Sequence, residues 1–313
     1  MSKFPNPGVY PNIDSKEYFG VGVNKDDMTK SVLSKSLLWA FGKNPRRWLE
    51  APPFEGTAAT RYGSLIDCLL LTPNRFYSDY VVAPATYEAK ESTKKNACLI
   101  DKPWNWNATV CKNWKIEQEK SGKILLKQDE LDDAEVAVDK MRADPTISYI
   151  LANSQTQCAV TGKMPVMEHP FEEDQGWLLG EYAVKTLLDI APDLDSDYGD
   201  SLIDLKTTGV MDSPTDIVWN SYKFGYHVQG AFYRDVYNAI TGEDRQRFHF
   251  IFQMSKAPYE HVMVEMSQDA LAKGREVYTE LVRKWHDTTT TGEWPSPFDN
   301  MTELDLPERA YQD

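Results

Sequence analysis

Two short apolar segments near the middle of the chain each contain an embedded charge, and this feature restricts the fold most. The segments are Lys185-Thr-Leu-Leu-Asp189 and Leu202-Ile-Asp204-Leu-Lys206. Their lengths and residue types are typical of β-strands, and the Asp-rich stretch between them is typical of a turn. The two segments are therefore expected to form adjacent antiparallel strands, which would bring Asp189 beside Asp204.

The charges on the second segment predict a metal site. Side chains alternate between the two faces of a strand, so Asp204 and Lys206 share one face while Leu205 points into the core. Two neighbouring buried carboxylates repel each other, and a divalent cation would compensate both charges. Carboxylate oxygens favour Mg²⁺ or Mn²⁺. With Lys206 to orient or deprotonate an attacking water, the pattern suits hydrolysis of a phosphodiester.

Each of these residues also has an ordinary structural explanation. Asp204 and Lys206 alone could form an ion pair on a strand without any catalytic role. Asp67 lies in a very apolar helical segment, where a charge should be paired or bind a ligand. It is a candidate metal ligand, and the alternative is a salt bridge to an arginine, with three to choose from: Arg46, Arg47 and Arg61. Glu168 is a further acidic candidate, and its alternative is a surface position on an edge strand.

The rest of the pattern predicts a mixed α/β sheet flanked by helices, in a single domain over residues 1–313. Helices are expected near residues 34–44, 59–71, 213–241 and 267–287, and an acidic amphipathic helix with a following turn is expected over 128–152. Three regions have a distinct expected character: an irregular lead-in over 1–28, a polar insertion or lid over 84–126, and a catalytic sheet core over 157–266.

The helix expected over 213–241 contains Gln229 and Tyr233, which are one turn apart and share a face. Both side chains can donate a hydrogen bond to a phosphate or to a water. The alternative is a half-buried helix face that packs on the sheet.

The ordered set of Asp189, Asp204-Leu205-Lys206 and Gln229-x-x-x-Tyr233 resembles the PD-(D/E)xK nuclease core in its RecB-like branch. From about residue 10 to 300 the chain resembles the RecE-like exonuclease VIII family, and it is also similar to lambda-type exonucleases. The segments RYGSLIDCLLLTPNRFYSDYVV and YHVQGAFYRDVY carry much of this resemblance. Many family members have a histidine where this chain has Asp67, and the commoner acid at the position of Asp204 is glutamate.

The resemblance implies a role for each site residue. Lys206 would position the nucleophilic water, and Gln229 with Tyr233 would support the phosphate or the lysine. Four residues would bind the catalytic Mg²⁺, for which Mn²⁺ would substitute: Asp67, Asp189, Asp204, and Leu205 through its backbone carbonyl. Asp67 has an alternative role, a hydrogen bond to a water on the cation.

The resemblance also implies an activity and partners. Family members degrade linear double-stranded DNA from 5′ ends, leave 3′ overhangs for an annealing protein of the RecT or beta type, and form trimeric or tetrameric rings. A phage-encoded protein in the cytoplasm of a bacterial host is expected. Two alternatives stay open: an endonuclease on the same fold, and a catalytically inactive DNA-binding or assembly protein.

The formal net charge of −14 argues against a broadly cationic surface for nucleic acid. DNA would therefore follow a confined basic path, and the candidate cations for it are Arg46, Arg47, Arg61, Lys90, Lys94 and Lys95. For each of them a solvated charge is the alternative. No apolar stretch is long enough for a membrane-spanning helix, so no membrane partner is expected.

Overall fold

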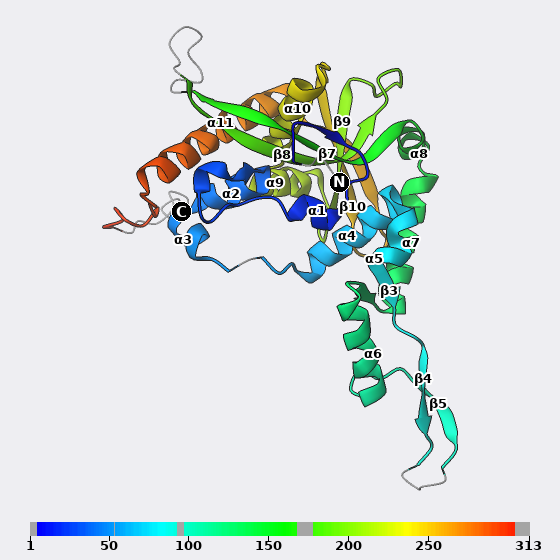
Figure 1. Ribbon diagram of the computed structural model, residues 1–313. Helices are drawn as coiled ribbons and strands as arrows, with labels where there is room; N and C mark the ends of the chain where they lie inside the picture. The colour runs from blue at the N-terminus through cyan, green and yellow to red at the C-terminus, as the bar shows by residue number, and fades with distance from the viewer. Residues whose placement is uncertain (1–4, 53, 93–96, 168–177, 304–313) are drawn as a thin grey trace, which may run out of the picture.

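The computed structural model describes residues 5–52, 54–92, 97–167 and 178–303, and its centre is a mixed β-sheet (Figure 1). The strand order is β1-β7-β8-β9-β10-β11, and β2 pairs with β8 off this path. β9 and β10 are parallel, whereas β7, β8 and β9 are antiparallel neighbours. The strands are β1 Gly8–Tyr10, β2 Val32–Leu33, β7 Ser154–Met167, β8 Leu178–Pro192, β9 Ser201–Thr208, β10 Arg247–Met254 and β11 His261–Glu265.

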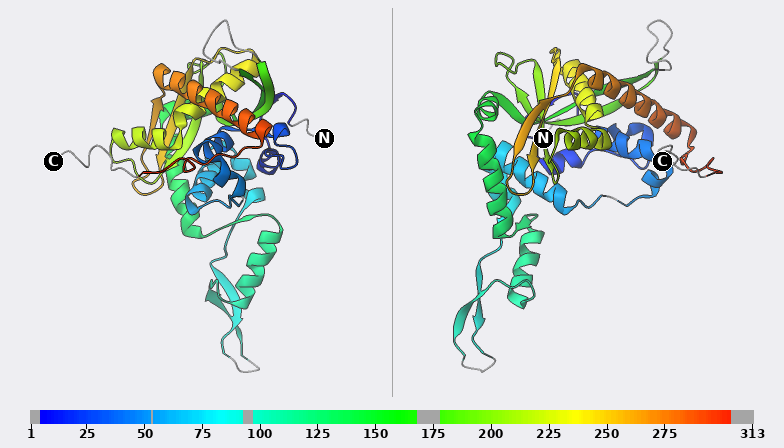
Figure 2. Two further views of the ribbon diagram at one scale, coloured as in Figure 1. Left: turned by 90° about the vertical axis from the view of Figure 1, so that its left-hand side faces the viewer. Right: turned by 180° about the vertical axis from the view of Figure 1, so that it is seen from behind.

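Helices cover both faces of this sheet (Figures 1 and 2). One face packs against α2 (Lys35–Lys43), α10 (Tyr226–Thr241) and α11 (Gln268–Thr291), and the other against α4 (Ala58–Leu71), α7 (Gln128–Ala143) and α8 (Pro145–Ala152). Each face has its own apolar core, with Phe232, Phe248 and Trp285 fully buried in the first and Ile66 and Ile251 in the second. The predicted α/β architecture with helices on the sheet is confirmed.

The first 28 residues are not wholly irregular, contrary to expectation. β1 adds to the edge of the sheet by pairing antiparallel with β7, and α1 (Ser15–Phe19) follows it. The side chain of Asp14 caps this helix by accepting hydrogen bonds from the backbone N–H groups of Lys16 and Glu17. A short edge strand is held by backbone hydrogen bonds, which leave no pattern of apolar side chains to read.

The described residues of the segment 84–126 form an arm that projects from the body of the protein (Figures 1 and 2). The arm contains the hairpin of β4 (Thr86–Lys90) and β5 (Leu99–Pro103) and the helix α6 (Thr109–Lys120). At its base, β3 (Tyr80–Val82) pairs in parallel with β6 (Ile124–Leu126). Ring centroids of Trp106 and Trp114 lie 5.5 and 5.1 Å from that of Trp104, so the polar insertion has an aromatic cluster of its own.

The helical region expected over 213–241 is broken once. The helix over 213–241 consists of α9 (Pro214–Phe224) and α10, which meet at Gly225 in a left-handed conformation with φ 65°. A Cβ atom on this glycine would lie 2.9 Å from the ring of Trp39, so the close approach of α2 also requires glycine at the junction. The segment 128–152, expected as a helix and a following turn, contains a second helix: α7 ends just before Asp144, and Asp144 caps the start of α8.

The other expected helices are confirmed within a few residues. Ser34 caps α2, and this helix ends at Asn44 before a proline. Short elements connect the larger ones: η1 Met28–Lys30, α3 Pro45–Glu50, η2 Pro73–Arg75 and α5 Phe76–Asp79. None of the helices in the described residues is both long and apolar enough to cross a lipid bilayer.

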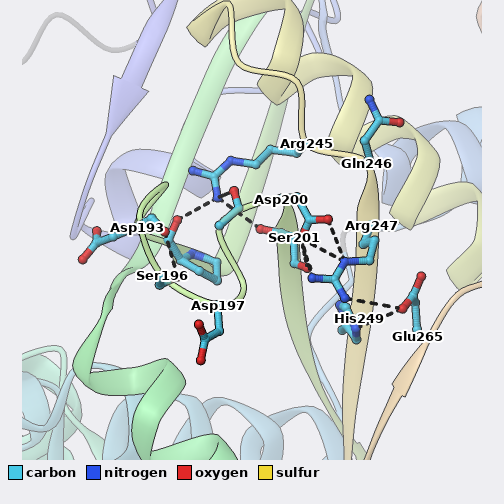
Figure 3. A network of polar contacts seen from close by, with 12 residues as sticks. Asp193, Ser196, Asp197, Asp200, Ser201, Arg245, Gln246, Arg247, His249 and Glu265 are labelled. Carbon is cyan, nitrogen blue, oxygen red and sulfur yellow. Dashed lines mark hydrogen bonds and ion pairs between the residues drawn. The ribbon is translucent and has the colours of Figure 1, made fainter.

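A buried arginine holds the turn between β8 and β9 (Figure 3). Arg245, 3% exposed, donates from Nη1 to the carbonyl oxygens of Pro192 at 2.7 Å and Gly199 at 2.6 Å. Its Nε donates to Glu243 at 2.6 Å. Because the turn joins the strands that carry Asp189 and Asp204, this guanidinium helps to set their spacing.

Replacing Arg245 with methionine should lower the free energy of unfolding by about 3 kcal/mol, because buried carbonyl oxygens and a carboxylate lose their donor. Arg247→Met is the matched control, since the Arg247 side chain is 32% exposed in its ion pair with Asp200. That change should cost less than about 1 kcal/mol. Urea denaturation measures both values, and equal losses would show that Arg245 does not hold the turn.

Candidate active site

Strand β8 is irregular at Asp189: the side chains on either side of this residue point to opposite faces of the sheet. This irregularity creates the site. Leu188 belongs to the core under α10, whereas Ile190 belongs to the core under α4, although residues two apart in a regular strand share a face. Regular pairing with β7 skips this position, between the pairs Thr156↔Ile190 and Cys158↔Leu188. On the other side, β8 pairs with β9 at Ile190↔Ile203. The strands therefore part at Asp189.

The carboxylate of Asp189 occupies the gap between the strands. Its Oδ2 accepts a hydrogen bond of 2.8 Å from the backbone N–H of Leu205 in β9. Its Oδ1 accepts one of 3.0 Å from Nε2 of Gln157 in β7, a residue with a left-handed φ of 49°. The Asp189 side chain thus takes the place of a backbone hydrogen bond between β8 and β9. This contact holds Asp189 close to Asp204.

Asp204 lies beside Asp189 and is 2% exposed. Its Oδ1 accepts a hydrogen bond of 2.6 Å from Nε2 of Gln229 in α10, and its Oδ2 forms an ion pair with the ammonium of Lys206. The predicted arrangement is confirmed here: Asp204 and Lys206 share a face, and Leu205 is buried in the core on the other side.

The acids of the site are held in an environment that disfavours their charge. Burial raises the pKa of Asp189 well above its usual range, and the neighbouring Asp204 and Asp67 add to the rise. Burial also raises the pKa of Asp204, although the charge of Lys206 opposes the effect. For Lys206, burial lowers the pKa, but the charges of Asp204 and Asp189 outweigh it, so the net pKa is raised and the lysine is an ammonium.

Asp67 approaches the same group from α4. This helix lies close to β9, since a Cβ atom on Gly63 would be 3.2 Å from Oγ1 of Thr207. Asp67 follows Gly63 by one turn, and burial raises its pKa to about 7, with Lys206 lowering it and Asp204 raising it. The charges that act on Asp67 are therefore those of the candidate site and not the arginines considered as alternative partners.

The raised pKa of Asp67 predicts a dependence of stability on pH. A carboxyl group whose pKa is higher in the folded chain binds protons preferentially there, so its stabilising contribution is complete below about 3.8 and lost as the pH rises through about 7. Asp67→Asn should therefore be more stable than the wild type by about 1–2 kcal/mol near pH 8 in EDTA, with the difference narrowing as the pH falls and closing only near pH 4. Chemical denaturation at both pH values measures this, and a difference that does not change with pH would contradict the assignment.

The donor set fits a divalent cation bound by two carboxylates. In the described ranges, no three histidine, cysteine, aspartate or glutamate side chains converge as a complete ligand shell. Asp189 and Asp204 nevertheless offer buried oxygens, and Oδ2 of Asp204 receives no hydrogen bond in addition to its ion pair with Lys206. Mg²⁺ is commonly held by one or two carboxylates together with waters and substrate oxygens. Ligand roles for the other expected residues stay predictions, and Glu168 lies outside the described residues.

α10 contributes two of the predicted residues in different ways. Gln229 is buried and its amide is used by Asp204, so in this structure it orients an acid of the site. Tyr233 is half-buried, and burial raises the pKa of its hydroxyl well above the usual range, with smaller effects from Tyr18, Asp204 and Asp189. It lies against the backbone of Leu187 in β8. A role for Tyr233 toward a phosphate stays a prediction.

Lys35 and Gln157 contribute to the surroundings of the site but were not predicted from the sequence. Lys35 is 8% exposed, and its ammonium donates to the backbone oxygen of Phe224 at 2.5 Å. Burial, followed by the charge of Lys206, lowers its pKa to about 7. The spacing of Lys35, Leu38 and Phe41 on one face of α2 was a signal that this lysine is buried. No comparable pattern indicates Gln157, because its contact depends on the register of β7.

The structure distributes the candidate DNA-binding cations over separate elements. Arg46, on α3, forms a bidentate ion pair with Asp299 at 2.6 and 2.7 Å, while Arg47 on the same helix is exposed. Arg61 is exposed on α4, six residues before Asp67, and Lys90 lies on the arm. Lys94 and Lys95 lie outside the described residues. No shared basic path emerges from the four that are described.

Comparison with known proteins places this geometry in a family. Residues 40–303 match a family described as a PDDEXK-like domain of unknown function, DUF3799. Among solved structures, a candidate exonuclease from Eubacterium rectale has a TM-score of 0.52 at 13% identity, covering 96% of this chain and 98% of that one. None of the curated proteins matches.

Two further solved structures are more distant. An alkaline exonuclease from Laribacter hongkongensis has a TM-score of 0.24 at 15% identity, covering 59% of this chain and 84% of that one. Rai1 from Scheffersomyces stipitis has a TM-score of 0.26 at 12% identity, covering 92% and 77%. The family match and the Eubacterium rectale structure together confirm the predicted PD-(D/E)xK fold class and agree with the RecE-like resemblance.

Proposed function

Because the chain belongs to the PDDEXK-like family DUF3799, we propose that it is a Mg²⁺-dependent exodeoxyribonuclease that degrades linear double-stranded DNA. The observation that carries this proposal is the buried pair of Asp189 and Asp204 at the parting of β8 and β9, with Lys206 on the same face as Asp204. Surplus negative charge at a buried position calls for a cation, and the ion pair with Lys206 compensates only part of it.

The hydrolysis reaction assigns a task to each residue. Water gives up a proton as its oxygen forms a bond to phosphorus, the bond from phosphorus to the leaving sugar oxygen breaks, and the leaving oxygen takes up a proton. Asp189 and Asp204 would hold the cation, with Gln229 and the backbone N–H of Leu205 fixing the two carboxylates. When bound, the cation supplies a Lewis acid that neutralises charge developing on the phosphate.

Lys206 would act on the water and the phosphate. Its ammonium is held by Asp204 and lies 5.4 Å from the ring centroid of Tyr226, so its position is restricted on two sides. From that position it would orient the attacking water and offset negative charge on the phosphate. Asp67 would contribute a further oxygen, either to the cation or to a water on it.

The finer points of the proposal are supported by the RecE-like resemblance. These are digestion from 5′ ends, 3′ overhangs passed to an annealing protein of the RecT or beta type, and assembly into a trimeric or tetrameric ring. A ring would keep the DNA threaded between successive cuts and so favour processive digestion. A phage-encoded origin and action in the bacterial cytoplasm belong to the same expectation.

The proposal predicts that Mg²⁺ supports release of nucleotides from 5′-labelled linear duplex DNA, while closed circular plasmid stays intact. An exonuclease needs an end, so linearising the same plasmid should convert it into a substrate. Cutting of the closed circle would favour the endonuclease alternative. No release from linear duplex with either Mg²⁺ or Mn²⁺ would favour an inactive DNA-binding protein.

A further inference from the structure

The helix α9 exposes a row of large apolar side chains close to the candidate site. None of its residues is buried, and three of its aromatic rings are open to solvent: Trp219 at 65%, Tyr222 at 68% and Phe224 at 47%. A surface helix normally turns its apolar side toward the core, and exposed apolar patches commonly mark binding surfaces. This patch therefore calls for a ligand with large flat apolar faces or for a protein partner.

A groove of about 830 Å³ runs beside α9. Its walls are mostly apolar and come from α9, from Trp39 of α2, from Met266 after β11 and from Val277 of α11. Lys223 and Lys273 also line it, and Lys273 pairs with Glu276 at 2.6 Å. The acidic lining residue, Glu265, lies 4.0 Å from the guanidinium of Arg247 and 3.5 Å from the imidazole of His249. The groove thus combines apolar walls with lysines.

A run of aromatic rings and lysines connects this groove to the catalytic residues. Tyr222 stacks on His227 with ring centroids 6.3 Å apart, and His227 meets Trp39 edge-on at 6.3 Å. The ammonium of Lys35 lies 5.4 Å from the ring of Trp39 and 5.9 Å from that of Tyr226. Because Lys206 lies 5.4 Å from the same Tyr226 ring, the run ends at the candidate site.

We infer that the α9 surface, defined as Trp219, Tyr222 and Trp39 with Lys43 and Lys223, binds single-stranded DNA next to the catalytic centre. Unpaired bases stack on aromatic side chains, and lysines between them neutralise the phosphates. Lys43 lies 5.5 Å from the ring of Trp39, and Lys223 lies 5.4 Å from the ring of Phe224. The chain has a net charge of −14, so this local set of cations beside aromatic rings is distinctive. It is complementary to a single strand, whose phosphates are negative and whose bases are exposed.

Single strands fit this surface better than duplex DNA does. In a duplex the faces of the bases are stacked on one another, so only unpaired bases can lie on Trp219 and Tyr222. The inference rests on the proposed function, since the surface would hold a strand separated from its partner near the point of cleavage. Binding itself requires no hydrolysis, and the two proposals can therefore be tested apart.

The test is equilibrium binding in EDTA, which prevents metal-dependent cleavage. Fluorescence anisotropy of a labelled oligothymidine of about 15 nucleotides, at fixed salt, reports the affinity of the wild type and of a Trp219→Ala, Tyr222→Ala double variant. Removal of two stacking rings should weaken binding roughly tenfold or more. Tyr77→Ala is the matched control, because Tyr77 is an 82% exposed ring on α5, and it should leave the affinity unchanged.

Three results would overturn the inference. They are an unchanged affinity of the double variant for the single strand, an equal loss of its affinity for matched duplex, and loss of wild-type self-association in the double variant by sedimentation. The last result would assign the surface to a second copy of the chain. Tight single-strand binding without any hydrolysis in Mg²⁺ or Mn²⁺ would support this inference while contradicting the proposed nuclease.

Discussion

Replacing Asp204 with asparagine is expected to slow hydrolysis of linear duplex DNA by about 10³-fold, equivalent to about 4 kcal/mol of transition-state stabilisation. The substitution keeps the shape of the side chain and an oxygen for Gln229, which donates to Oδ1 at 2.6 Å. It removes a negative charge and one hard oxygen from the pair that would hold the cation. Initial rates at saturating Mg²⁺ measure the loss.

Asp200→Asn is the matched control for this experiment. Asp200 directly precedes β9, but its side chain is 48% exposed and pairs with Arg247 at 2.5 Å. The control should hydrolyse DNA at nearly the wild-type rate. Thermal melts add a second readout: Mg²⁺ should raise the melting temperature of the wild type and of the control, but hardly that of Asp204→Asn. A near-normal rate in Asp204→Asn would remove Asp204 from the catalytic site.

Replacing Lys206 with alanine is expected to lower the hydrolysis rate by about 10²- to 10³-fold and also to destabilise the metal-free protein by about 3 kcal/mol. The pKa of Lys206 is raised in the folded chain, so its stabilising contribution is complete below its unfolded pKa near 10.5 and is fully present near neutral pH. Without the ammonium, the buried carboxylates repel each other uncompensated. Urea denaturation in EDTA and initial rates in Mg²⁺ measure the two effects.

Mg²⁺ should separate the two effects of this substitution. A bound cation compensates the carboxylates, so it should restore most of the stability of Lys206→Ala while the rate stays low. Lys163→Ala is the control, because the Lys163 side chain is 65% exposed in its ion pair with Glu181 and should change neither quantity much. If Mg²⁺ restored both stability and rate, Lys206 would be a charge-compensating residue without a part in the chemistry.

The arrangement of side chains on β9 could be predicted from the sequence, because it depends only on the residues of that strand. Alternation along a strand places Asp204 and Lys206 on one face whatever the rest of the fold does, and the structure has them in an ion pair. The adjacency of β8 and β9 followed from two strand-like segments joined by a turn. The family resemblance then suggested which acids would bind the cation, and those roles stay predictions.

The features that sequence reasoning missed depend on contacts between distant segments. The irregularity of β8 at Asp189 depends on a hydrogen bond from Gln157, a residue of β7 with a left-handed backbone. The spacing of residues within one segment does not reveal a contact between two strands. The break at Gly225 depends on the approach of Trp39 from α2. Lys35 is an exception, since its place on the apolar face of α2 was visible in the sequence.

Part of the chain's negative charge is concentrated at the candidate site. Asp67, Asp189 and Asp204 gather part of the negative charge around one lysine, where it calls for a cation. Of the cations expected to bind DNA, the four that the structure describes lie on separate elements, and the clearest local set is the lysines among the aromatic rings of the α9 surface. An acidic chain with such a confined basic surface should bind duplex DNA weakly away from its ends, and more weakly still as salt rises.

The central claim is that Asp189 and Asp204 together hold the catalytic cation. Anomalous diffraction from crystals soaked in Mn²⁺ tests it most directly, because the signal locates the ion independently of any activity. The expected result is a peak about 2.0–2.3 Å from an oxygen of each carboxylate, with the ammonium of Lys206 moved away from Asp204. A peak at other acids, or none while Lys206 keeps its ion pair with Asp204, would contradict the claim.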